Sequence, residues 1–322
     1  MKKIAAVLLI SLLPFMVSCS INRMAINAIS NALTGEGSAD VFTGDSDPEL
    51  VGDALPFAIK LYETLLAQNP GHQGLLFTTG SLFIMYANAF VQGPAEMLDS
   101  LDYYEERQAG LNRAKALYLR GVGHLYTAMG KKYPGFDSAM DNEESRESFL
   151  QRFKKEDVPL LYWSVAGGLS AYALGGGFDF QLASKIPEWS AMMARAYELD
   201  PDFNNGAIDD FYILYYASLP EALGGDKDKA EIHFRRAVEK SRGLSAGPYV
   251  SYAKSVCVPA QDYDTYKENL EKALAIDPGE DPSNRLVNTL SQRKAQHLLD
   301  TAYEYFSFLP YSDGYDDYYD DY

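Results

Sequence analysis

The chain has 322 residues, of which 47% are hydrophobic, and 45 Asp and Glu against 28 Lys and Arg give it a formal net charge of −17. This composition excludes disorder over most of the length and supplies the core of one large or two ordinary domains. The negative charge argues against a nucleic-acid partner, because a phosphate backbone is bound by a basic surface. Leu and Ala greatly outnumber the β-branched residues, which predicts an all-α fold.

The first 18 residues have the pattern of a signal peptide. Two lysines precede an apolar run, and Ser18-Cys19 follows it directly. A small residue before a cysteine at this point resembles a bacterial lipobox, so we expect lipid attachment at Cys19 and a bacterial cell-envelope location, with the body in the periplasm. Residues 19–47 then form a lipidated segment and linker. Simple cleavage without a lipid is the alternative, and no later apolar run is expected to span a bilayer.

Residues 48–308 are predicted to form one all-helical domain. Asp47-Pro48 places an N-cap before a proline at the first helical position, which opens a helix that runs to about residue 69. No stretch shows the strict alternation of a half-buried strand. Glycines and prolines divide the rest into helical segments near 74–91, 94–133, 143–153, 157–174, 187–200, 204–218, 227–241, 246–257, 261–276 and 283–307.

Four segments match a degenerate tetratricopeptide pattern, in which small residues let antiparallel helices approach and bulky ones fill the groove between pairs. The repeats predict antiparallel helix pairs stacked in a superhelix. Chance matches in an alanine-rich helical bundle are the alternative. The matching sets are Ala58, Tyr62, Leu65 and Pro70; Met193, Ala196 and Pro201; Ala230, Phe234 and Ala237; and Tyr266, Leu270, Ala273 and Pro278.

The sequence nominates no catalytic group, metal site or cofactor site. Its four histidines are scattered, and no phosphate-binding or dinucleotide-binding motif occurs. The neighbouring carboxylates Asp209-Asp210 and Glu143-Glu144 are expected on solvated faces, since adjacent residues on a helix diverge. Cys257 is expected to be a buried small hydrophobe. A hydrolase would need Asp209 or Asp179 facing a histidine in a deep cleft.

Aromatic residues are the stronger signal, with 24 Tyr and 16 Phe in the chain. Rings that combine an apolar body with a polar tip suit a ligand channel or a partner interface, although packing between helices is the simpler interpretation of any one of them. The candidate ligand or partner surface comprises Tyr162, Trp163, Trp189, Phe211 and Tyr215. The tail, 309–322, is rich in Tyr and Asp and is expected to be a disordered acidic extension.

Several segments resemble the TatT lipoproteins, the tetratricopeptide-containing partners of TRAP transporters. The likeness spans nearly the whole mature chain. One departure follows Tyr162-Trp163, where the family commonly has bulky residues and this chain has Gly167-Gly168. The segments that carry the likeness include Asp47-Pro48-Glu49-Leu50, Ala54-Leu55-Pro56-Phe57, Tyr86-Ala87-Asn88-Ala89-Phe90-Val91, Leu117-Tyr118-Leu119-Arg120-Gly121, Tyr133-Pro134-Gly135-Phe136, Leu161-Tyr162-Trp163 and Ile276-Asp277-Pro278.

The resemblance implies a non-enzymatic, lipid-anchored periplasmic protein that assembles as a homotrimer. It further implies that the partner is the solute-binding receptor of a TRAP transporter, and that the ligand is small and hydrophobic. Helical repeats and an aromatic interior agree with this expectation. The alternative is a generic tetratricopeptide scaffold lipoprotein that assembles envelope complexes without a ligand.

Overall fold

The computed structural model describes residues 26–35, 37, 40–99, 102–176 and 179–309. These residues form helices and loops without a strand, which confirms the all-α prediction. The signal peptide, Cys19 and most of the tail lie outside the described residues, so the predictions made for them stay predictions. The stacking of neighbouring helices is compatible with tetratricopeptide-like repeats.

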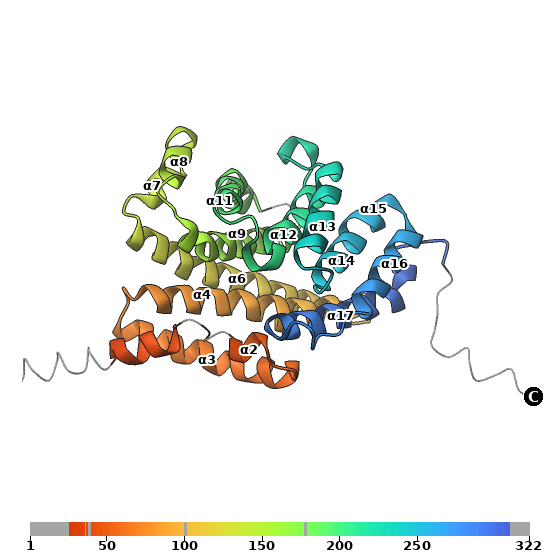
Figure 1. Ribbon diagram of the computed structural model, residues 1–322, viewed down its shortest axis with the longest axis horizontal. Helices are drawn as coiled ribbons and strands as arrows, with labels where there is room; N and C mark the ends of the chain where they lie inside the picture. The colour runs from red at the N-terminus through yellow and green to blue at the C-terminus, as the bar shows by residue number, and fades with distance from the viewer. Residues whose placement is uncertain (1–25, 36, 38–39, 100–101, 177–178, 310–322) are drawn as a thin grey trace, which may run out of the picture.

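The N-terminal helices lie side by side as consecutive layers (Figure 1). A short α2 (Asp40–Thr43) precedes α3 (Pro48–Gln68), which packs on α4 (Gln73–Ala87). Next, α4 packs on the long α6 (Tyr104–Lys132), and α6 on α9 (Val158–Ala173). The layers begin as the sequence predicts, because the Asp47 side chain accepts a hydrogen bond from the Leu50 N–H at 3.0 Å and Pro48 occupies the first turn.

The remaining helices continue the stack toward the C-terminus, where α17 returns to lie against α2 and α3 (Figure 1). Small alanines lie at the close approaches, since Ala196, Ala230, Ala237 and Ala273 are almost completely buried. The elements in order are α7 (Phe136–Met140), α8 (Glu143–Leu150), α10 (Phe180–Ala183), α11 (Ile186–Leu199), α12 (Ala207–Ser218), α13 (Lys227–Lys240), α14 (Gly247–Tyr252), α15 (Val258–Ala260), α16 (Tyr263–Leu274) and α17 (Arg285–Asp300).

Two of the predicted helical boundaries differ from those observed. The helix expected to start near residue 204 starts at Ala207, because Asn204, Asn205 and Gly206 all have positive φ. The final helix ends at Asp300 and is followed by a short 3₁₀ turn rather than continuing to 307.

Two π-helical turns interrupt the helices, η1 (Asn88–Gln92) and η5 (Ala253–Cys257). In η1 the turn aims two amides at one buried phenol: the Asn88 side chain donates to the Tyr118 hydroxyl at 3.1 Å, and that hydroxyl donates to Gln92 at 2.6 Å. After η1 comes α5 (Gly93–Glu96). Wide turns of this kind are rare and often occur at functional positions.

The buried apolar residues form two clusters. The first runs from Val51 to Tyr212 with Leu286, and the second from Ala246 to Phe306. A polar clip joins the two parts: Glu96, at the end of α5, accepts from Lys254 on η5 at 3.3 Å and from Lys294 on α17 at 3.0 Å. This contact connects residues that lie 158 and 198 positions apart in the chain.

One stretch of the described residues, Gln73–Glu96, is long and apolar enough by composition to cross a membrane. Half of its most apolar window is buried inside the structure, where α4 packs between α3 and α6. The core helix of a soluble protein passes the same test, so the stretch is weak evidence for a membrane span.

Candidate functional site

Four of the five predicted surface aromatics lie half-buried on α9 and α12. On α9, the Tyr162 ring meets Trp163 edge-on with centroids 5.6 Å apart, and it lies 5.2 Å from Phe203, just before α12. On α12, Phe211 and Tyr215 stack at 6.0 Å because residues four apart share a helix face. We call these five rings the aromatic region.

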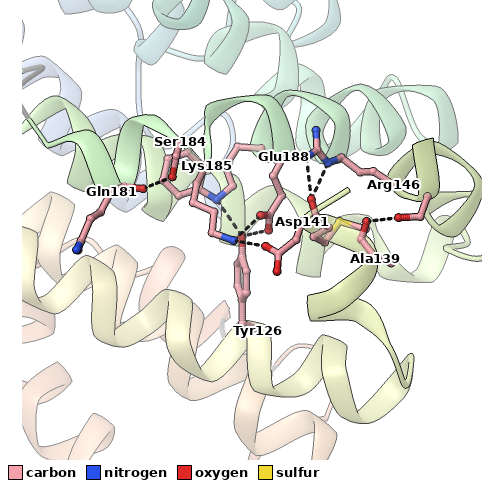
Figure 2. Close-up of polar contacts among 11 residues, drawn as sticks. Tyr126, Ala139, Asp141, Arg146, Gln181, Ser184, Lys185 and Glu188 are labelled. Atoms are coloured by element: carbon pink, nitrogen blue, oxygen red, sulfur yellow. Dashed lines mark hydrogen bonds and ion pairs between the residues drawn. The ribbon is translucent and has the colours of Figure 1, made fainter. Parts of the chain in front are cut away.

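Trp189 lies elsewhere, in the core between α6 and α11, with 2% of its surface exposed. Its indole N–H donates to the Tyr126 hydroxyl at 3.0 Å, and that hydroxyl donates to Glu188 at 2.6 Å. Lys185 completes the network by binding Glu188 at 3.0 Å and Asp141 at 3.4 Å (Figure 2). This placement gives Trp189 a packing role, so we leave it out of the aromatic region.

The departure at Gly167-Gly168 creates no opening, because neighbouring side chains fill the space. A Cβ on Gly168 would lie 2.5 Å from the Trp189 ring, and one on Gly167 would lie 2.7 Å from Ile84. Glycine at both positions lets α9 approach α11 and α4 closely. The wall beside Tyr162 is therefore closed by packing.

Replacing Gly168 with alanine is expected to destabilise the fold by about 1–3 kcal/mol, because the rigid indole of Trp189 cannot move aside without strain. The matched control is Gly123→Ala on α6, where a Cβ meets nothing within 4 Å. That change is expected to stabilise by roughly 0.5–1 kcal/mol through helix propensity. Urea denaturation measures both, and equal effects of the two substitutions would contradict the packing described here.

Asp210 is a buried carboxylate at the edge of the aromatic region. Its Oδ1 has no hydrogen-bond partner among the described residues, and Oδ2 lies against Gly247, where a Cβ would be 2.9 Å away. Burial raises the pKa of Asp210 to about 6, with the Ser251 side chain acting in the opposite direction. Burial and the charge of Asp210 also raise the pKa of Tyr162. The aromatic region thus contains one polar group whose charge depends on pH.

Asp209 faces a histidine, as a hydrolase would require. The His233 Nδ1 lies 2.6 Å from Asp209 Oδ1, and Asp209 is fully buried. Lys240 and Tyr197 also donate to this carboxylate, at 2.7 and 3.2 Å. Burial raises the pKa of Asp209, but the hydrogen bonds from His233 and Lys240 outweigh it and lower the pKa.

The surroundings of this pair are those of a structural contact. The ring of His233 stacks with Tyr216 at 5.5 Å and lies 4.7 Å from Tyr212, and no serine, threonine or cysteine in the described ranges is recorded as its hydrogen-bond partner. The expectation that Asp209-Asp210 lies on a solvated face is wrong, because α12 turns both carboxylates inward. Asp179 forms an ion pair with Lys115 at 2.9 Å rather than facing a histidine.

The other reactive side chains are accounted for by packing. Cys257 is 2% exposed, as predicted, and burial together with Asp262 raises the pKa of its thiol to about 12. Glu143 and Glu144 are exposed, as predicted. Within the described part of the chain, no three His, Cys, Asp or Glu side chains gather as a metal site. A cavity of about 240 Å³ between α8 and α11, beside Leu150 and Arg195, is separate from the aromatic region.

These features define an all-α protein of stacked helix pairs, a class whose surfaces contact other molecules. A family described as the TRAP transporter T-component matches residues 44–306. An uncharacterized protein of Treponema pallidum (strain Nichols) is 35% identical over 306 residues, which cover 89% of this chain and 93% of that protein. The chain therefore belongs to the TRAP transporter T-component family.

Family membership confirms the resemblance found in the sequence. It makes the chain a component associated with TRAP transporters and suggests a transport-associated, non-catalytic role at the cell envelope. The sequence did not identify Asp210 as part of the site. Its only signal was an acidic residue directly before the aromatic run of α12, which an exposed helix face shares.

Proposed function

We propose that the chain is a non-enzymatic component of solute uptake that binds the solute receptor of a TRAP transporter and helps transfer a small hydrophobic ligand. The family match over residues 44–306 carries the proposal. The aromatic region supports it, because half-buried rings on two adjoining helices present apolar surface with polar edges. A net charge of −17 disfavours an anionic ligand and so supports a neutral or apolar one.

The proposed mechanism depends on position. A lipid on Cys19 would hold the protein at a membrane surface, with the helical body in the periplasm, and so raise the local concentration of receptor and carrier. The ligand would then pass along Tyr162, Trp163, Phe211 and Tyr215. Asp210 would give this path a polar point that contacts a hydroxyl or amide of the ligand.

Capture of partners by the anchored protein tests the proposal. We expect the tagged full chain to retain a periplasmic solute receptor and a co-purifying small molecule, both identified by mass. Tyr162→Ala and Phe211→Ala are expected to lower ligand retention about tenfold or more, since large rings dominate apolar contacts. The matched control is Phe180→Ala, because Phe180 is 83% exposed on α10. Thermal melts confirm that each variant is folded.

The Cys19→Ser variant separates the anchor from the docking role. It is expected to appear in the soluble fraction and to bind the receptor still when the two proteins are mixed. Retention in membranes would contradict lipid attachment. Capture of envelope proteins without any receptor or small molecule would instead favour the generic scaffold.

A further inference from the structure

The outer face of α3 carries an apolar stripe with no partner among the described residues. Leu50 is 58% exposed, Phe57 74% and Leu61 40%, and Ala54 between them is also exposed. The helix lies at the edge of the stack (Figure 1). A different face of α3 already packs on the core, through Val51, Leu55, Ile59, Tyr62 and Leu66.

The spacing of the stripe is that of a coiled-coil seam. Leu50, Ala54, Phe57 and Leu61 are separated by four, three and four residues, as alternating d and a positions are. Singly scattered apolar residues on a surface are ordinary, but a continuous stripe along a helix edge indicates an interaction site. The stripe spans three turns of a 21-residue helix.

We propose that α3 pairs with α3 of a second copy of this chain, antiparallel about a twofold axis. In that arrangement a positions face d positions, so that Ala54 lies opposite Phe57 of the second copy and Leu50 opposite its Leu61. A small residue then faces a large one in the two central layers, which fills the interface evenly. A parallel pairing sets Ala54 against Ala54 and Phe57 against Phe57, and so leaves one layer open and one crowded.

The charges beside the stripe support the same occupant and the same direction. Asp53 and Lys60 are both exposed and occupy the g positions that flank the central layers. Antiparallel pairing places each Asp53 next to Lys60 of the second copy, and the twofold axis forms this contact twice. A parallel pairing would place both beside Val51, Ala58 and Leu65, the e positions, which carry no charge.

The contact is small, since one helix pair buries less than the roughly 800 Å² per partner of a stable interface. It is therefore expected to be weak in free solution and to be strengthened when both copies are confined to one surface. The proposal does not rest on the proposed function. It gives a dimer contact, in contrast to the homotrimer that the resemblance implies, so the oligomeric state tests it directly.

Charge exchange in sedimentation equilibrium provides the test, on the purified chain at up to millimolar concentration. We expect a monomer–dimer equilibrium that Phe57→Asp weakens about tenfold or more. Asp53→Lys and Lys60→Asp are each expected to weaken it several-fold. The double variant D53K/K60D, or a mixture of the two single variants, is expected to restore pairing. Only an antiparallel contact predicts this rescue.

Lys60 also binds Glu63 in its own chain at 2.8 Å, so thermal melts verify that each variant is folded. Phe180→Asp is the matched control for a new charge on an exposed ring, and it is expected to leave pairing unchanged. A monomer at every concentration, a trimer, or a double variant that fails to regain pairing would each overturn the proposal.

Discussion

Glu96→Gln is expected to destabilise the protein by about 3 kcal/mol at neutral pH, because it removes the anion that two buried lysine contacts require. Glu96 also accepts from Gln92 at 2.7 Å, and its side chain is only 18% exposed. Burial raises the pKa of Glu96, but the charges of Lys294 and Lys254 outweigh it and lower the pKa to about 2. Glutamine keeps the shape but leaves both ammonium groups without a counter-charge.

The pH dependence follows from the direction of this shift. A carboxyl whose pKa falls from 4.5 to about 2 on folding stabilises the fold above pH 4.5 and loses that contribution as the pH falls toward 2. Wild type should therefore lose stability over this window, and Glu96→Gln should lack this component. Urea unfolding across the range measures it. Glu268→Gln is the matched control, since Glu268 pairs with Lys272 on an exposed helix face at 2.8 Å.

Asp210→Asn is expected to have the opposite effect and to stabilise the protein at neutral pH by about 2–3 kcal/mol. The carboxylate Oδ1 has no hydrogen-bond partner, so ionisation places an uncompensated charge in the core. Asparagine has nearly the same size and no charge, and its amide can still meet the Ser251 side chain. A gain in stability from the loss of an acid marks a residue retained for something other than folding.

The sign of this second pH dependence differs from that of Glu96. Folding raises the pKa of Asp210 from 3.8 to about 6, so the native state binds more protons between these values, and stability falls as the pH rises through them. The variant should lack this fall. Urea unfolding at pH 4 and pH 7.5 separates the two proteins, with the exposed Asp102→Asn as the control. Equal pH profiles for wild type and Asp210→Asn would show that the carboxyl is solvated.

Most of the helices could be predicted from local patterns, because caps, prolines and apolar periodicity act within a few residues. Asp47-Pro48 opens α3 as expected, and Cys257 is buried as expected. The π-helical turns and the late start of α12 were missed. Both depend on a single residue's backbone geometry, which composition and periodicity average away.

The candidate site was predicted less completely, because its contacts join distant parts of the chain. Tyr162 and Phe211 look equally amphipathic to Trp189 in the sequence, and only the third dimension places Trp189 under Gly168. Asp209 and Asp210 were expected in solvent. Their partners His233 and Gly247 come from helices that follow later, and one sequence does not state which helices meet.

The wide turns at η1 and η5 have a consequence for insertions and deletions. A π-turn holds one residue more than an α-turn of similar height, and each residue rotates a helix by about 100°. The surplus residue in η1 therefore sets the azimuth at which Glu96 leaves its helix, and the one in η5 does the same for Cys257. Trimming either turn to regular geometry would tidy the backbone and swing these side chains away from their neighbours. Chain length at these two points is thus as constrained as residue identity.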